Sequence, residues 1–431
     1  MLKVVVSFGV NNHDKHPRKM KSQPDVIDLI ATARWPAPNP FYDLLTVALE
    51  AMRFNPPWYF SSIFGTPRSW LPPHHSYSEY NIISPWQPLT TARYLLDISL
   101  PSTARSTPDL ARLLLPPVVN RRFWRPTHFF RQPDEYGGDS SFPGEHWFFI
   151  NGIATNEDVA RLNAAYLAHL FHRPLTVIQN STNSLPCDLY ECAIGKGLKP
   201  NPDATDRDTM TEPAWRATTA ILEALNAGHN RRVVVIAHSQ GTIIAANVLR
   251  AITKVLRDKL ARSNNPQWHP FTNQMMVEVK TGTQKILRDN LAHAFSSFAR
   301  GGVKPALRRL EKLEMYTFAN CADKMKYVYP NQQLPYLEHF ANERDLVARL
   351  GVLSPLRGQG AQIDIDGPVY EQKGAWGHLL NQHYLMPIDD HLYPGGKKFR
   401  HERNPFPGPA KVDISPRLYR YFHGKHPVAS A

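Results

Sequence analysis

Residues 233–241 read Val-Val-Val-Ile-Ala-His-Ser-Gln-Gly, and the rest of the chain is interpreted outward from this stretch. The β-branched run up to Ala237 predicts a strand that is buried on both faces, as in a parallel sheet. A helical pattern follows directly and runs to about Leu260. A strand, a tight turn and a helix form the setting in which the residue on the turn, here Ser239, is presented at the carboxyl edge of a sheet.

The residues around Ser239 match the steric demands of such a turn. Small residues must stand two positions before and two positions after the serine, because the turn is strained and closely packed. Gly241 meets this demand, and Ala237 stands where glycine is more usual but is still small. Ser239 is therefore the predicted nucleophile, and the backbone N–H of Gln240 is predicted to face the oxyanion of the reacting carbonyl.

Short apolar runs alternate with helical patterns on both sides of this stretch. The other predicted strands are 147–150, 175–178, 315–319 and 336–340, with a short one at 369–371. Alternation of this kind predicts an α/β fold with a mostly parallel sheet flanked by helices. Residues 261–313 interrupt it with a helical insertion, which is interpreted either as a lid over the site or as a helix pair packed at the periphery.

The rest of the chain divides by composition. Of 431 residues, 38 are proline, and many of these prolines fall before residue 145. Residues 1–144 are therefore predicted to be a Pro-rich accessory region, which precedes the catalytic domain or packs on it. Residues 145–390 are predicted to be that domain, and residues 391–431 a C-terminal tail.

A serine nucleophile needs donors for the oxyanion, a base and an acid. A second donor is expected in the turn after an earlier strand, and the backbone N–H of Ile153, after Gly152, fits this position. The order of the chain in this kind of fold is serine, acid, histidine. Asp345, in the turn after the strand at 336–340, is the predicted acid, with Glu343 and Asp323 as competing carboxylates.

The base is expected after one more strand, near the end of the predicted domain. His378 follows a glycine and precedes the apolar pair Leu379-Leu380, so it is the predicted base. His383 is the alternative, and the sequence leaves the choice between them open. The chain has 19 histidines, so the prediction of His378 depends on its position in the chain and not on its residue type alone.

Three segments together resemble the lipase- and esterase-like serine hydrolases of the α/β-hydrolase superfamily. They are Ala-His-Ser-Gln-Gly-Thr at 237–242, Asn-Glu-Arg-Asp-Leu-Val at 342–347 and Gly-His at 377–378. The resemblance covers about residues 145–390. It implies hydrolysis of a carboxylic ester through an acyl-enzyme, with no cofactor and no metal. Alternatives are an acyltransferase or thioesterase that uses the same triad, or a non-catalytic hydrolase-like interaction protein.

Charge and cysteine content bear on partners and location. The net charge of +13 favours anionic partners, so contact with an anionic membrane surface is considered beside a small-molecule or lipid ester substrate. No nucleic-acid signature accompanies the charge, and no nucleic acid partner is expected. Three cysteines, no signal-peptide pattern at the start and no long apolar stretch favour a cytoplasmic location.

Overall fold

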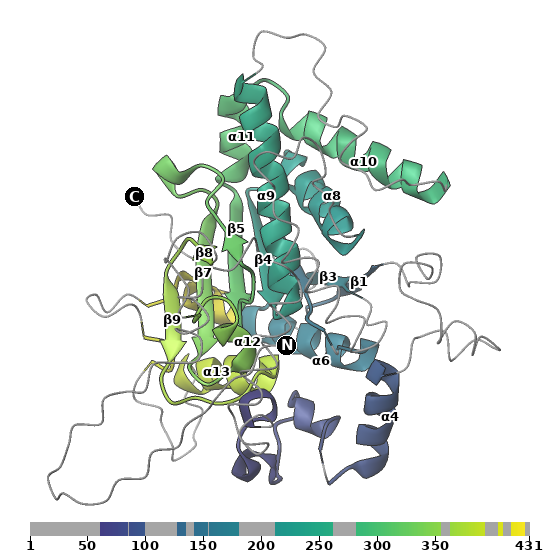
Figure 1. Cartoon of the computed structure of the whole chain (residues 1–431), viewed down its shortest axis with the longest axis vertical. Coiled ribbons are helices and arrows are strands. Elements are labelled where there is room, and N and C mark those ends of the chain that lie inside the picture. Colours follow the sequence, from purple (N-terminus) through teal and green to yellow (C-terminus); the bar gives the residue numbers. More distant parts are fainter. Residues whose placement is uncertain are drawn as a thin grey trace, which may run out of the picture.

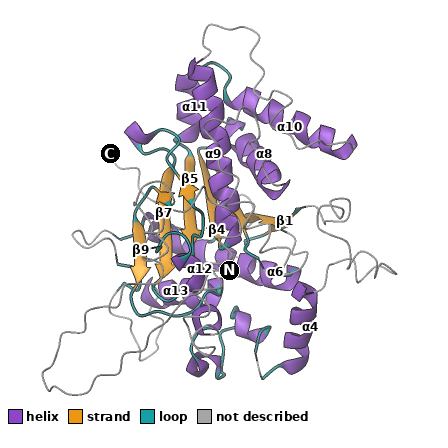
Figure 2. Ribbon diagram, in the orientation of Figure 1, coloured by secondary structure: helices purple, strands orange, loops and turns teal. Residues whose placement is uncertain are grey.

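The computed structural model describes residues 61–84, 86–99, 127–134, 142–153, 155–180, 212–261, 282–354, 363–392, 404–407 and 415–426. Cys187 and Cys192, the first 60 residues and part of the insertion, 262–281, lie outside these ranges. The described residues build a seven-stranded sheet with helices packed on it (Figures 1 and 2). The predicted α/β architecture with a mostly parallel sheet is confirmed.

The strand order is β1-β3-β2-β4-β5-β7-β9, and only β1 runs antiparallel to its neighbour. The strands are β1 (His128–Gln132), β2 (Glu145–Ile150), β3 (Leu175–Gln179), β4 (Arg232–His238), β5 (Leu313–Phe318), β7 (Tyr336–Asn342) and β9 (Val369–Gln372). A separate parallel pair consists of β6 (Lys324–Met325) and β8 (Asp364–Ile365). β4 lies between β2 and β5, and its residues 233–237 are buried, which explains why this strand has no polar face.

The α-helices are α4 (Pro88–Ser99), α6 (Glu157–Phe171), α8 (Glu212–Asn226), α9 (Gln240–Ala261), α10 (Gly282–Phe298), α11 (Val303–Leu310), α12 (Leu346–Arg349) and α13 (Met386–Leu392). The 3-10 helices are η1 (Pro67–Trp70), η2 (Glu79–Asn81), η6 (Pro330–Gln332) and η8 (Arg417–Gly424), and η7 (Leu380–Leu385) is a π-helix. Asn156 caps α6, because its side chain accepts a hydrogen bond of 3.0 Å from the backbone N–H of Val159.

The described part of the predicted insertion lies toward the amino-terminal ends of the strands. α10 packs against α8, and the side chain of Asn226, at the end of α8, donates a 3.0 Å hydrogen bond to the carbonyl oxygen of Ala294. α11 ends three residues before β5 begins, at the same end of the sheet. Figure 1 shows α10 and α11 at the top of the molecule and α13 below the sheet.

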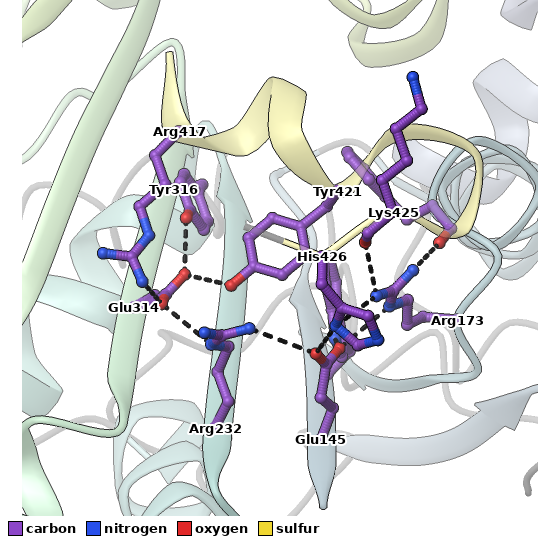
Figure 3. A network of polar contacts seen from close by, with 11 residues as sticks. Glu145, Arg173, Arg232, Glu314, Tyr316, Arg417, Tyr421, Lys425 and His426 are labelled. Carbon is purple, nitrogen blue, oxygen red and sulfur yellow. Dashed lines mark hydrogen bonds and ion pairs between the residues drawn. The ribbon is translucent and has the colours of Figure 1, made fainter. Parts of the chain in front are cut away.

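The sheet draws on residues outside 145–390. β1 belongs to the region predicted to be accessory, and it extends the sheet by pairing with β3. Its five residues lack the clear alternation of polar and apolar side chains by which an edge strand is recognised in a sequence. The described residues 415–426, within the predicted tail, pack at the amino-terminal edge of the sheet (Figure 3).

Glutamates of the sheet hold this C-terminal segment. Glu314 of β5 accepts hydrogen bonds from Arg417 at 2.6 Å and from the hydroxyl of Tyr421 at 2.6 Å, and it pairs with Arg232 of β4 at 3.2 Å. Glu145 of β2 pairs with Arg173 at 3.0 Å (Figure 3).

Arg173 is itself fastened to the segment, because it donates a 2.8 Å hydrogen bond to the carbonyl oxygen of Lys425. Since each buried charge has an opposite charge or a hydrogen-bond partner, the contact avoids the cost of an unpaired buried ion. The amino-terminal edge of the sheet is thus closed by residues 415–426.

A search of the described residues for a helix that is both long and apolar enough to span a membrane found none.

Candidate active site

The turn between β4 and α9 holds Ser239 in a strained conformation. Its φ is +56°, in the left-handed region that non-glycine residues rarely adopt. The backbone N–H of Ser239 donates to the carbonyl oxygen of Phe318 at 3.1 Å, and the Ser239 carbonyl oxygen accepts from Thr242 Oγ1 at 2.7 Å. Strain at a single residue, held by the surrounding hydrogen bonds, is typical of functional turns.

Close packing around this turn explains the small residues on either side of Ser239. A Cβ at Gly241 would collide with the carbonyl oxygen of Ile150, at the end of β2. Ala237 is buried between Ile150 on one neighbouring strand and Thr317 on the other. The start of α9 can therefore lie against the end of β2 only because position 241 has no side chain.

The turn after β2 lies directly against Ser239. A Cβ at Gly152 would be 2.6 Å from Cβ and 3.1 Å from Oγ of Ser239. The structure thus places the peptide between Gly152 and Ile153, the predicted second oxyanion donor, beside the serine side chain. Gln240, the predicted first donor, begins α9, and N–H groups in the first turn of a helix have no acceptor within that helix.

Three amide side chains brace this turn. Asn151 accepts from the backbone N–H of Asn180 at 2.7 Å and donates to the carbonyl oxygen of Gly152 at 3.0 Å. Asn180 also donates from its side chain to Oε1 of Gln240 at 2.6 Å. The network joins the ends of β2 and β3 to the first residue of α9, so both predicted donor positions belong to one hydrogen-bonded unit.

Asp345 and His378 are brought together by the structure, although 32 residues separate them in the sequence. Nδ1 of His378 lies 2.8 Å from Oδ2 of Asp345. Because a carboxylate accepts hydrogen bonds, this contact selects the tautomer of His378 with the proton on Nδ1 and the lone pair on Nε2. This is the tautomer that a general base requires.

The Asp345 carboxylate is buried and held by further donors. Oδ1 accepts from the backbone N–H groups of Val347 at 2.8 Å and Ala348 at 3.4 Å, so Asp345 also caps α12. Oδ2 accepts from the hydroxyl of Tyr384 at 2.6 Å. With both oxygens fixed, the orientation of the His378 ring is fixed as well.

His238 ties His378 to the turn that carries Ser239. Nε2 of His238 lies 2.9 Å from the carbonyl oxygen of His378, and the centres of the two rings are 4.6 Å apart. Burial lowers the pKa of His238 well below its ordinary value, and the nearby His378 lowers it further. His238 is therefore neutral with its proton on Nε2, which it donates to the His378 main chain.

His383, the alternative base, is committed to other partners. Its Nδ1 accepts from the backbone N–H of Leu379 at 2.9 Å, and its Nε2 lies 2.9 Å from the hydroxyl of Tyr80. Burial lowers the pKa of His383 to about 3, so the ring is neutral. Because both ring nitrogens are engaged, this histidine holds the structure around His378.

The competing carboxylates lie elsewhere. Glu343 accepts from the backbone N–H of Gly374 at 2.5 Å, and it contacts the loop before His378 without bonding its ring. Asp323 directly precedes β6, and its carbonyl oxygen accepts from the backbone N–H of Asp364 at 2.7 Å.

Sequence reasoning missed two residues of this arrangement. His238 stands inside the recognised segment, but its side chain is assigned no role by the spacing of that segment. Tyr384 lies six residues after His378, and nothing in its surroundings distinguishes it from other core tyrosines.

The described parts of the chain hold no group of three or more histidine, cysteine, aspartate or glutamate side chains that could bind a metal ion. Comparisons with protein-family models, with curated proteins and with solved structures each gave no match.

Proposed function

We propose that this protein is a serine hydrolase of the α/β-hydrolase kind, which cleaves carboxylic esters through an acyl-enzyme. The observation that carries the proposal is the 2.8 Å contact between His378 and Asp345, together with a serine held at positive φ in the turn that His238 ties to His378. Each feature alone occurs in proteins without catalytic activity. Together they support the roles of nucleophile, base and acid for Ser239, His378 and Asp345, at the carboxyl edge of a parallel sheet, where α/β proteins bind ligands.

In the proposed mechanism, Oγ of Ser239 attacks the ester carbonyl carbon while Nε2 of His378 removes the hydroxyl proton. The charge that develops on the carbonyl oxygen is stabilised by the backbone N–H groups of Gln240 and Ile153. The imidazolium is stabilised by Asp345 and gives its proton to the departing alcohol. Water, activated by the same histidine, then attacks the acyl-enzyme and releases the acid.

Two features bear on the substrate and on access to it. Among the described residues, five large apolar side chains between 71 and 96 are exposed: Leu71, Trp86, Leu89, Leu95 and Leu96. Exposed apolar side chains near the elements that carry the site favour an ester with an apolar acyl chain. The described helices of the insertion, α10 and α11, lie at the other end of the sheet, so we interpret them as a peripheral helix pair.

The test is turnover of a short p-nitrophenyl ester by the Ser239→Ala variant. We expect hydrolysis and labelling by a fluorophosphonate probe to be lost, while Ser296→Ala, an exposed serine on α10, behaves as wild type. Undiminished hydrolysis by Ser239→Ala contradicts the proposal. Adding an alcohol distinguishes an acyltransferase, which forms a new ester faster than free acid. A wild-type chain that the probe does not label is a non-catalytic protein.

A further inference from the structure

Residues 61–84, which we call the strap, lie against the loop and helix that follow β9. They come from the region that precedes the sheet in the sequence, yet they contact the main chain of the proposed base directly. The carbonyl oxygen of Ile63 accepts a hydrogen bond of 2.8 Å from the backbone N–H of His378. The strap therefore fixes the backbone of His378, whereas Asp345 fixes its ring.

A buried carboxylate of the strap contacts the helix after this loop. Oε1 of Glu79 accepts from the backbone N–H of Asn381 at 2.7 Å, and Oε2 accepts from that of Gln382 at 2.9 Å. These are among the first N–H groups of η7, which have no acceptor within that helix. Burial raises the pKa of Glu79 to about 7, although the two N–H groups and the nearby His378 favour the charged form.

A second set of contacts surrounds His383 in the same helix. The hydroxyl of Tyr80 lies 2.9 Å from Nε2 of His383, and the hydroxyl of Ser78 donates to Oε1 of Gln382 at 2.5 Å. Gly65 allows the approach, since a Cβ there would lie 2.5 Å from Nε2 of His383. Its φ of +77° also favours glycine. The strap thus holds η7 at several consecutive residues.

An apolar cluster extends the connection to the other side of the site. Leu379, the residue after His378, packs with Phe64 and Ile83 of the strap and with Val159 of α6. α6 follows the turn that contains Ile153, and its Leu162 carbonyl oxygen accepts a 3.3 Å hydrogen bond from the side chain of Asn381. The strap therefore links the loop of the base to the helix behind the oxyanion turn.

We propose that the strap is part of the active site and that Glu79 is a positioning residue, which holds His378 in its productive orientation by capping η7. This inference rests on the proposed function of Ser239 and His378. Glu79 touches no reacting atom. It fixes main-chain groups three and four residues after His378, and the Ile63 carbonyl fixes His378 itself.

Positioning has a kinetic signature that differs from a general loss of stability. Displacement of a catalytic group by about 1 Å can cost about 10²-fold in rate, because the reacting atoms no longer meet at the required distance. Since Glu79 makes no contact with the reacting atoms, its loss should lower kcat and leave KM nearly unchanged.

The experiment compares Glu79→Gln with a matched variant at the other end of the sheet, Glu338→Gln. Glu338 is also buried, and it also accepts from two consecutive backbone N–H groups, those of Arg417 at 2.7 Å and Leu418 at 3.2 Å, at the start of η8. In both variants the new NH₂ group faces a backbone N–H, so both should lower the melting temperature. The two variants differ in where the damage occurs.

We expect Glu79→Gln to lower kcat by about 30- to 100-fold, with KM changed less than about threefold and with fluorophosphonate labelling slowed in proportion. Glu338→Gln should keep kcat within about twofold of wild type. Glu79→Asp, which keeps the charge but shortens the reach to both N–H groups, should lower kcat at least about tenfold and serves if Glu79→Gln does not fold.

A folded Glu79 variant with wild-type kcat overturns the proposal, as does an equal loss of kcat in Glu338→Gln. Ser239→Ala in the same assay separates this failure from a failure of the proposed function. If Ser239→Ala is inactive and Glu79→Gln is fully active, only the inference about the strap is wrong. If Ser239→Ala is fully active, the proposed function itself is wrong.

Discussion

Replacing Asp345 by asparagine changes one atom of the proposed triad and reverses its hydrogen bonding. Oδ1 accepts the two backbone N–H groups at the start of α12, so an asparagine oxygen should stay there, and asparagine caps helices as well as aspartate does. The new NH₂ group then takes the place of Oδ2. It faces the Nδ1–H of His378 at 2.8 Å and the hydroxyl of Tyr384 at 2.6 Å.

Two donors cannot bond to each other, so His378 should move its proton to Nε2 and lose the lone pair that removes the serine proton. Restoring the reactive tautomer would leave a buried donor facing a donor. We take this cost to be that of breaking a buried charged pair, which is about 3–5 kcal/mol. At about 1.4 kcal/mol for each tenfold change, kcat/KM should fall by about 10² to 10⁴.

The assay is kcat/KM for a p-nitrophenyl ester, measured beside a thermal melt, which should change little because the cap on α12 is kept. Glu343→Gln is the matched control. Glu343 is a neighbouring acid, and it accepts a hydrogen bond from the backbone N–H of Gly374 instead of from the ring of His378. This variant should stay within about threefold of wild type. A folded Asp345→Asn variant that loses less than tenfold, or a larger loss in Glu343→Gln, would refute the reasoning.

Two further predictions concern Glu79 and Gly152. Folding raises the pKa of Glu79 from 4.5 to about 7, so its contribution to stability is largest below pH 4.5 and is lost as the pH rises through 7. That is about 3 kcal/mol at about 1.4 kcal/mol per pKa unit. Urea unfolding should show that the wild type loses this much relative to Glu79→Gln between pH 4.5 and pH 8, and a constant difference contradicts the prediction. The groups whose charges act on Glu79 or are acted on by it are His378, Tyr80, Tyr94 and Tyr166, and none is altered by the substitution. Gly152→Ala would place a Cβ 2.6 Å from Cβ of Ser239, so we expect kcat to fall by about 10²-fold through displacement of the oxyanion turn. A melting temperature near wild type with unchanged kcat would show that the turn does not serve the reaction.

Much of the fold could be predicted from local patterns. The β-branched run before Ser239 has no polar face because β4 lies in the middle of the sheet, and Asn156 caps α6 by the hydrogen bond that its position predicts. The joining of Asp345 to His378 could also be anticipated, since the ends of parallel strands meet at one edge and chain order limits the choice.

The remaining contacts could not be read from the sequence, because they join residues that no local period connects. Glu79 lies about 300 residues before the helix it caps. His383 was the alternative to His378 in the sequence, and the two are distinguished by the bond of His378 to Asp345 and by the bonds of His383 to Leu379 and Tyr80. Residues 415–426 bond to Glu314 and Glu338, which lie about 80 to 100 residues earlier in the chain, so their role appears only with these partners in the sheet.

The contacts made by residues 415–426 and by the strap have a consequence for the order in which the chain folds during synthesis. Glu145 and Glu314 are translated long before Arg417, Tyr421 and Lys425. Glu79 likewise precedes the amides that it caps. A nascent chain that ends before residue 417 already contains Arg173 and Arg232, which pair with Glu145 and Glu314, but it lacks the partners from residues 415–426. The full set of contacts at the amino-terminal edge of the sheet can therefore form only after the last residues of this segment have been synthesised.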